Sequence, residues 1–236
     1  FEVVRADAPI PPQAWRRRRP ADLLKLVALA PGRTLSREEA IDTLWPDKDP
    51  ASGANNLHRA LYDLRQVLGG RWVDIDRGQL SLRPDVWVDV DAFERAVPEG
   101  GRENWTLAVA LYRGDLAPED LESPWLQARR TALRRRFAEV ALPLARATAA
   151  EGEAQLAIPL LRRVLAVDPA AEEAHATLMR LLAENGRRAE ALRQYDACEA
   201  AAVLFLRRFG GAMAARAASP TALLQMLAKV ADLLPS

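Results

Sequence analysis

Residues 52–68 alternate apolar and polar positions with the period of an α-helix. Four leucines fall at i, i+4, i+7 and i+11 and therefore share one face: Leu57, Leu61, Leu64 and Leu68. The opposite face carries Asn55, Arg59, Tyr62 and Gln66, with His58 and Arg65 on one shoulder. Asn and Gln pair with adenine, Arg pairs with guanine, and Tyr reaches a phosphate, so this polar stripe suits a DNA major groove. Taken alone, it equally describes the solvated face of an ordinary helix.

Two further helices are predicted upstream. Residues 19–30, RPADLLKLVALA, have an apolar face and end before Pro31-Gly32. Ser36 stands three residues before Glu39, the spacing of a capping box, and Pro46 ends that second helix after Trp45. We expect residues 50–52 to give the turn and cap of the third helix, which Gly69-Gly70 closes.

A β-hairpin is predicted after the third helix. Residues 72–75 and 80–82 read as strands joined across residues 76–79, with Gly78 where a positive φ is easiest. Three helices and a hairpin in about 65 residues predict a winged helix-turn-helix, whose third helix enters the major groove while the wing touches the backbone. Arg77 of the wing is then a candidate for the backbone or minor groove. Arg17, in the run of four arginines at 16–19, is a candidate for phosphate, although the run also fits a solvated surface.

A small sheet is expected at the amino-terminal end. Residues 1–5 and 9–15 read as strands around a turn at 6–8. The chain has no initiator Met and opens inside the first of these strands, which leaves open a further strand before residue 1.

From residue 88 the composition shifts to Ala, Leu and Arg, and the pattern becomes helical. Helices are expected at 104–112, 124–150 and 221–234, with Pro143 kinking or ending the second. Gly152 and Gly186 lie 34 residues apart, and the residues that follow them correspond: Ala157 with Ala191, Ile158 with Leu192, Leu161 with Tyr195. A 34-residue period with Gly between helices is typical of tetratricopeptide repeats, and Asp168-Pro169 falls where a repeat turns to its next helix.

Residues 15–70, WRRRRPADLLKLVALAPGRTLSREEAIDTLWPDKDPASGANNLHRALYDLRQVLGG, resemble the DNA-binding domain of the SARP family of bacterial transcriptional activators. The resemblance rests on the basic entry to a leucine-rich helix, on Leu44-Trp45-Pro46 and on NNLHRALYDLRQVLG at 55–69. VDVDAFERAV at 88–97 is similar to the point where the family passes into its bacterial transcriptional activation domain. The resemblance implies an OmpR-type winged helix, direct-repeat DNA sites, and a tetratricopeptide-like domain for contacts with RNA polymerase or a second copy.

One segment departs from the family pattern. After Tyr195 the family usually continues through an acidic helix and a Glu-Leu-Gly and Pro-containing turn, whereas this chain reads AAAVLFLRRFGGAMAARAASPTALL at 200–224. The departure leaves the surface of the last helical pair, and any partner it serves, open.

Composition bounds the fold and the compartment. A chain of 236 residues with 50% hydrophobic content most naturally forms two domains, here 1–87 (winged helix) and 88–236 (tetratricopeptide-like activation domain), in a mainly α fold with small β elements. The single cysteine, Cys198, excludes an internal disulfide and fits a reducing cytoplasm. No apolar run approaches the roughly 20 residues that span a bilayer, and no signal peptide opens the chain, so a cytoplasmic protein without membrane contacts is expected.

No motif points to catalysis. His58 and His175 lack the spacing of a zinc site, no GxxxxGK[ST] occurs, and no residues are arranged to activate a nucleophile. We therefore expect no enzyme activity, no metal and no cofactor. His58 reaches a phosphate or simply lies on the surface. The first hypothesis is a sequence-specific DNA-binding regulator, an activator, that binds double-stranded DNA and contacts RNA polymerase or a second copy through its helical domain. The alternative is a tetratricopeptide-type interaction module whose winged helix does not bind DNA. A third hypothesis makes the chain the amino-terminal part of a larger regulator.

Overall fold

The computed structural model describes residues 1–209, and the side chains of residues 1–204. The chain divides into two compact units. Among the described residues, the first comprises 1–94 and 116–126, and the second comprises 95–115 and 127–209. A segment that follows residue 115 in the helical half of the sequence thus belongs to the amino-terminal unit. The predicted division at residue 87 stays a prediction.

The first unit opens with a short hairpin. β1 (Val4–Arg5) pairs with β2 (Ala8–Pro9) across a turn in which Ala6 and Asp7 both have positive φ. The predicted strand at 9–15 is wrong beyond Pro9, because Pro11 and Pro12 carry no N–H to donate to a sheet. The chain instead forms a 3₁₀ turn at Pro12–Ala14.

Three helices follow: α1 (Arg18–Leu29), α2 (Arg37–Leu44) and α3 (Pro50–Leu68). The predicted capping box is confirmed, since Glu39 N donates to Ser36 Oγ at 3.0 Å and Ser36 N donates to a Glu39 carboxylate oxygen at 3.0 Å. α3 begins at Pro50, two residues before the predicted start at Ser52. Asp49 is its cap, accepting from the backbone N–H groups of residues 51 and 52, and Pro50 occupies the first helical position, where its missing N–H costs nothing.

The wing is part of a three-stranded antiparallel sheet with strand order β3-β5-β4. Its strands are β3 (Thr34–Ser36), β4 (Val73–Asp76) and β5 (Gln79–Leu82). The predicted hairpin is confirmed, with a tighter turn than expected: Asp76 pairs with Gln79, so only Arg77 and Gly78 form the loop. Both have positive φ, 46° and 80°. β3 was not predicted.

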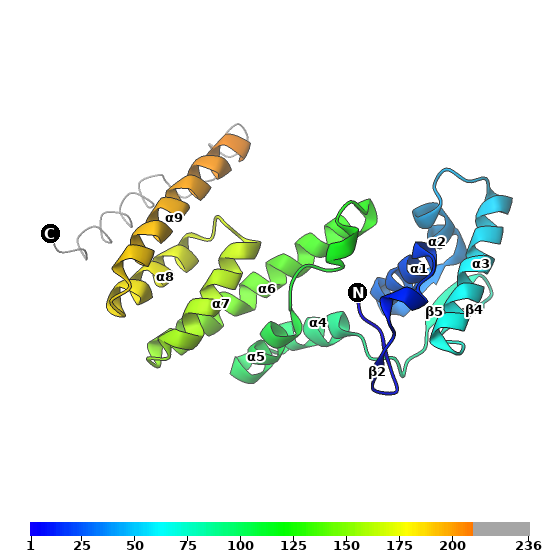
Figure 1. Ribbon diagram of the computed structural model, residues 1–236, viewed down its shortest axis with the longest axis horizontal. Helices are drawn as coiled ribbons and strands as arrows, with labels where there is room; N and C mark the ends of the chain where they lie inside the picture. Colours follow the sequence, from blue (N-terminus) through cyan, green and yellow to red (C-terminus); the bar gives the residue numbers. More distant parts are fainter. Residues whose placement is uncertain (210–236) are drawn as a thin grey trace. The chain divides into compact units, whose positions relative to one another are not determined.

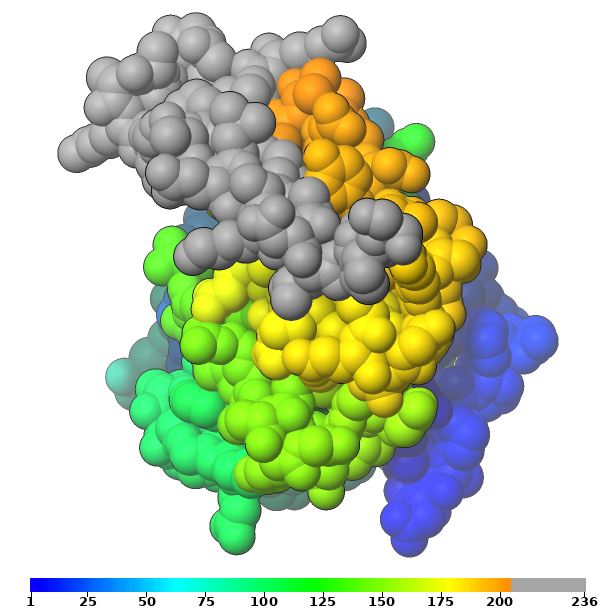
Figure 2. All heavy atoms as spheres, turned by 90° about the vertical axis from the view of Figure 1, so that its left-hand side faces the viewer, coloured from blue at the N-terminus to red at the C-terminus, as the bar shows by residue number. Residues whose placement is uncertain are grey.

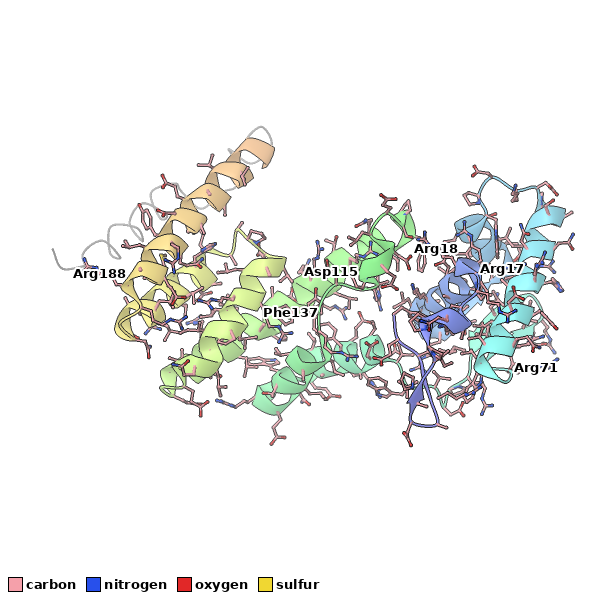
Figure 3. All side chains as sticks on the ribbon, in the orientation of Figure 1. Arg17, Arg18, Arg71, Asp115, Phe137 and Arg188 are labelled. Carbon is pink, nitrogen blue, oxygen red and sulfur yellow. The ribbon has the colours of Figure 1, made fainter. Side chains whose placement is uncertain are left out.

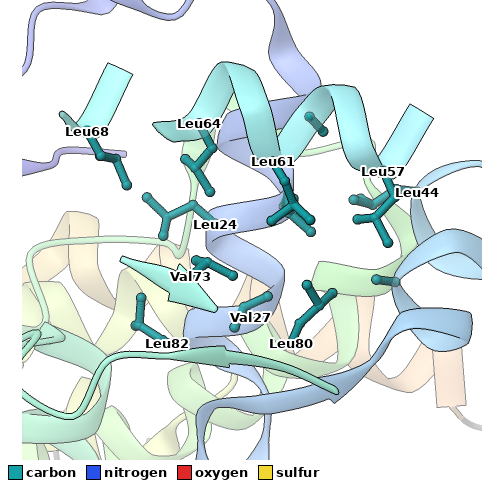
Figure 4. Packing of buried hydrophobic residues seen from close by; sticks show 13 residues of the cluster. Leu24, Val27, Leu44, Leu57, Leu61, Leu64, Leu68, Val73, Leu80 and Leu82 are labelled. Atoms are coloured by element: carbon teal, nitrogen blue, oxygen red, sulfur yellow. The ribbon is translucent and has the colours of Figure 1, made fainter. Parts of the chain in front are cut away.

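The core of the first unit is built on the leucine stripe of α3. Figure 4 shows these side chains pointing at α1 and at the wing strands. The buried residues are Leu23, Leu24, Val27, Ala40, Leu44, Leu57, Ala60, Leu61, Leu64, Leu68, Val73, Leu80 and Leu82. Each large side chain in this core contributes about 1.5–3 kcal/mol by its burial. The predicted buried face of the third helix is therefore confirmed.

The rest of the described chain is helical (Figure 1): α4 (Asp89–Glu99), α5 (Gly101–Leu111), α6 (Pro124–Ala150), α7 (Ala154–Val167), α8 (Glu172–Glu184) and α9 (Arg188–Phe209). Pro143 does not end α6, contrary to one of the two expectations for it; the helix runs on to Ala150. Buried side chains on either side of this proline, those of Ala141 and Leu144 among them, hold the helix in place and offset the lost hydrogen bond.

The 34-residue repeat appears as successive packed helices. α7 packs against α8, and α8 against α9, as the adjoining yellow-green and yellow atoms of Figure 2 show for the first pair. Gly152 and Gly186 lie at equivalent turns, before α7 and before α9, with φ values of 83° and 72°. Ala157 and Ala191 are both buried, as their correspondence predicts, whereas Leu192 is 46% exposed. The predicted final helix at 221–234 lies outside the described residues.

Candidate nucleic-acid interface

α3 presents the predicted polar stripe to solvent. Five of the proposed residues are exposed: Asn55, His58, Arg59, Tyr62 and Gln66. Tyr62, in the middle of the stripe, is 61% exposed although it is a large aromatic residue. The leucines on the opposite side of the same helix are buried, so the stripe is a continuous outward face over a packed core.

Arg65 is the exception among the α3 residues, because it is half-buried. Its Nε is enclosed and has no hydrogen-bond partner within the described part of the chain. A buried donor on a cation is costly to leave unpaired. No ion pair neutralises this guanidinium within the described residues, so its charge is available to an anion such as a phosphate.

Both ends of α3 are fixed. At its carboxyl end the Leu68 carbonyl accepts hydrogen bonds from Arg5 Nη1 at 2.9 Å and from Trp72 Nε1 at 3.1 Å. The cation of Arg5 also complements the negative end of the helix dipole. Gly69 follows with φ 68°, a conformation that favours glycine, and a Cβ there would lie 2.2 Å from Arg5 Nη1 and displace this flexible side chain from the Leu68 carbonyl.

The wing holds Arg77 at its exposed tip. The adjacent Gly78 carbonyl accepts a hydrogen bond from the Arg37 backbone N–H at 2.8 Å, which ties the turn to the start of α2. Asp74 and Asp76 on β4 are both exposed, and the register places them on the face that also carries Ser81 and Gln79. Arg77 is thus the only cation in the hairpin at 73–82, against two carboxylates.

The arginine run at 16–19 is neither a free phosphate site nor a uniformly solvated surface. Arg17 pairs with Asp63 of α3 at 3.6 Å. Arg18 pairs with Asp120 at 2.7 Å, and Arg19 pairs with Asp22 at 3.3 Å. Figure 3 labels Arg17 and Arg18 at the start of α1. Three of the four cations are therefore balanced by carboxylates of the first unit, including the candidate phosphate contact.

One exposed cation near α3 was missed from the sequence. Arg71 follows the two glycines that close α3 and lies at the end of that helix in Figure 3. Its position directly between the proposed recognition helix and the wing is the signal that could have found it. An exposed arginine there is suited to a backbone phosphate beside the groove.

The second unit contains a polar cluster that reads as structural. Arg163 donates to the carbonyls of Val109 and Tyr112 at the end of α5, and Tyr112 stacks on Phe137 with ring centroids 4.4 Å apart. Burial, helped by the nearby Asp115 carboxylate, raises the pKa of Tyr112 to about 12. A hydrogen bond from Arg134 in turn lowers the pKa of Asp115. Each of these polar groups has a hydrogen-bond partner within the cluster, as expected for a contact that holds helices together.

His175 also has a structural environment. It is buried, with Nε2 3.0 Å from the Pro169 carbonyl and Nδ1 2.6 Å from the Gln194 side-chain nitrogen. Among residues 1–209 no three His, Cys, Asp or Glu side chains are grouped to hold a metal ion. No helix in that range is long and apolar enough to cross a membrane.

A winged helix-turn-helix followed by stacked helical pairs defines a class of transcription regulators. Comparison with known protein families and solved structures places the chain in the same class. Residues 88–204 match the bacterial transcriptional activator domain and belong to that family, which is not an enzyme family. The chain therefore has the architecture of the SARP-type regulators that its sequence resembles.

One solved structure shares the fold over nearly the whole chain. It is EmbR of Mycobacterium tuberculosis, in complex with a low-affinity phosphopeptide, which aligns with 98% of this chain at a TM-score of 0.65 and 18% identity. The chain spans 62% of the EmbR chain. At this identity the likeness shows the fold alone. A search of curated proteins finds no match.

Proposed function

We propose that the protein is a sequence-specific DNA-binding transcriptional activator that places α3 in the major groove. The observation that carries the proposal is the exposed polar stripe of α3 over a fully packed leucine face. Asn55 and Gln66 would read adenine, Arg59 would read guanine, and Tyr62 and His58 would reach the backbone. The fixed ends of α3 support this role, because base readout needs side chains held in place before binding.

Arg65 would take a phosphate. It is half-buried and forms no ion pair within residues 1–209, so a phosphate would neutralise its charge. Arg17 would contribute phosphate contact only in exchange for its ion pair with Asp63. We therefore rank Arg65 above Arg17 as a source of affinity that does not depend on sequence.

The wing would place Arg77 on the backbone or in the minor groove. Arg77 adopts φ 46°, a left-handed conformation that costs an ordinary residue about 1 kcal/mol or more. A strained arginine at an exposed tip supports a function for the side chain itself, because asparagine or glycine would fit the turn better.

The helical unit would serve protein contacts, with RNA polymerase or a second copy of the chain as partner. Family membership of residues 88–204 supports a role in activation. Large apolar side chains exposed on its helices, Leu156 of α7 and Leu192 of α9, are suited to such contacts.

The test is selection of duplex DNA from a random pool by the purified chain, followed by affinity for the winning duplex and for its scrambled version at two salt concentrations. A preference of about a thousandfold or more is expected of a specific regulator. A repeated motif in the winner would support binding by more than one copy.

The second candidate function is a protein-interaction module whose winged helix does not bind DNA. The exposed Asp74 and Asp76 favour it, because carboxylates on a wing repel phosphates. Weak binding with equal affinity for winning and scrambled duplexes would favour this function over the first.

A further inference from the structure

Residues 116–126 form an acidic segment, LAPEDLESPWL, with three carboxylates and no cation. The family match assigns this segment to the activator domain, yet it belongs to the same compact unit as the winged helix. It opens at Ala117, which has φ 46°, and continues as a 3₁₀ turn at Pro118–Asp120. The activator domain thus contributes a piece of chain to the DNA-binding unit.

This acidic segment binds the cations of α1. Lys25 Nζ donates to Glu119 Oε1 at 2.7 Å and to Asp120 Oδ2, and both the Lys25 and the Asp120 side chains are buried. Arg18 Nη2 lies 2.7 Å from the other Asp120 oxygen and 3.1 Å from Ser123 Oγ. One carboxylate therefore bridges two cations of α1, as a phosphate group would.

The charges explain what the segment does to α1. With the segment in place, the cations Arg18, Arg19 and Lys25 pair with Asp22, Glu119 and Asp120, and Glu119 also accepts from the amino group of Phe1. Without it, the same three cations would face Asp22 alone and leave a net charge of +2. Burial raises the pKa of the Asp22 carboxyl.

The residue that precedes Arg18 contacts the proposed recognition helix. Arg17, next to Arg18, pairs with Asp63 of α3, one residue from Tyr62. Arg18 is 63% exposed even when paired, so an external phosphate can reach it. DNA in contact with α3 would therefore be a competitor for the site that Asp120 occupies.

We infer that the start of α1 is a second phosphate-binding site and that the acidic segment of the activator domain occupies it as an intramolecular phosphate mimic. In this docked state the charge of Arg18 is neutralised, which weakens sequence-independent DNA binding. The affinity for DNA then depends mainly on the base contacts of α3. Release of the segment frees Arg18 for the DNA backbone. The inference rests on the proposed function in one respect, that duplex DNA is the natural competitor.

The experiment compares Asp120→Asn with Glu122→Gln in the full chain. Both variants remove one negative charge from the same segment, but Glu122 is exposed and makes no ion pair within the described residues. We expect Asp120→Asn to bind scrambled duplex about three- to tenfold more tightly at low salt, with a salt slope steeper by about one counterion. Equal binding by the two variants would overturn the inference.

Arg18→Gln tests whether the gain in DNA affinity of Asp120→Asn depends on Arg18. In the Asp120→Asn background it should remove the whole gain, whereas in the unmodified chain it should change little, because Arg18 is already neutralised. A large loss from Arg18→Gln alone would contradict the docked state, since it would mean that Arg18 already contacts DNA.

Inorganic polyphosphate separates this inference from the proposed function. If the chain prefers no duplex sequence, the proposed function fails, but Asp120→Asn should still bind polyphosphate more tightly than Glu122→Gln. Hydrogen exchange on the unmodified chain requires no variant to fold. Polyphosphate should accelerate exchange of the Asp120 and Ser123 amides, which donate to Ala117 and Asp120 carbonyls at 2.9 Å in the docked segment. Unchanged or slower exchange there would overturn the inference.

Discussion

Gly53 in the first turns of α3 lies directly against Ile41 of α2: a Cβ added to Gly53 would be 2.4 Å from Ile41 Cγ2. Glycine inside a helix costs about 1 kcal/mol relative to alanine, so close packing of the two helices is what justifies it here. The contact sets the separation of α2 and α3 and thereby the position of the polar stripe.

Gly53→Ala should therefore lower the free energy of unfolding by about 1–3 kcal/mol, because the β-branched Ile41 side chain cannot move aside cheaply. Urea unfolding measures the effect. Ile41→Ala removes the methyl group that clashes, so the double variant should be less destabilised than the two single variants predict together. A more stable Gly53→Ala chain would show that the helices can separate without cost.

Substitutions of Arg59 and of Arg65 should affect DNA binding in different ways, although both residues lie on α3. Arg59→Ala should weaken binding to the selected duplex by about 1–3 kcal/mol and leave scrambled duplex nearly unaffected, if it pairs with guanine. Arg65→Ala should weaken binding to both duplexes and reduce the salt slope by about one, because a phosphate contact releases counterions.

Equilibrium titration of both duplexes at several salt concentrations separates the two effects. Arg193→Ala on α9, an exposed cation outside the winged helix, is the matched control and should change neither affinity. If Arg59→Ala left the preference for the selected duplex intact, the proposed orientation of α3 would be wrong.

The parts of this fold that follow from local pattern were predictable. Leucine spacing gave the buried face of α3, the Ser36–Glu39 spacing gave the start of α2, and two glycines 34 residues apart gave the helical repeat. β3 was missed because its three residues are held by pairing with β5, more than 40 positions later, and not by any signal of their own.

The electrostatic context of the candidate site depends on the same kind of distant contact. The run at 16–19 reads as four cations, but Asp63 and Asp120 balance two of them only once the chain is folded. The DNA-binding roles of Arg17 and of the site residues from Asn55 to Arg77 stay predictions, and most of the α3 residues among them are exposed.

The raised pKa of Tyr112 should make the second unit less stable at alkaline pH. Burial raises its pKa from the ordinary 10.0 to about 12, so the unfolded chain loses this proton first as the pH rises. The stabilisation is fully present below pH 10 and is lost between about pH 10 and 12, by about 2–3 kcal/mol in all. Denaturant unfolding from pH 9 to 12 should show this loss, and Tyr112→Phe should remove it. The same slope in both chains would assign the alkaline loss to other groups.

Arg77 offers the sharpest distinction between the two candidate functions, because its backbone and its side chain should have opposite effects. Asparagine tolerates the left-handed conformation of the turn better than arginine does, so Arg77→Asn should raise the free energy of unfolding by about 1 kcal/mol. The same change should weaken binding to selected and scrambled duplexes alike and reduce the salt slope by about one. Urea unfolding and duplex titration of the one variant measure both effects.

A gain in stability with unchanged DNA affinity would mean that Arg77 does not touch DNA. The carboxylates of Asp74 and Asp76 would then dominate the charge of the wing, and a positively charged protein surface would be its natural partner.

Neutralising these two carboxylates provides the complementary measurement. Asp74→Asn with Asp76→Asn should strengthen DNA binding if the wing lies against the backbone, because two repulsive charges are removed. No change in DNA affinity from either the arginine or the aspartate variants would place the wing away from DNA and leave α3 as the only element of the winged helix that reads it.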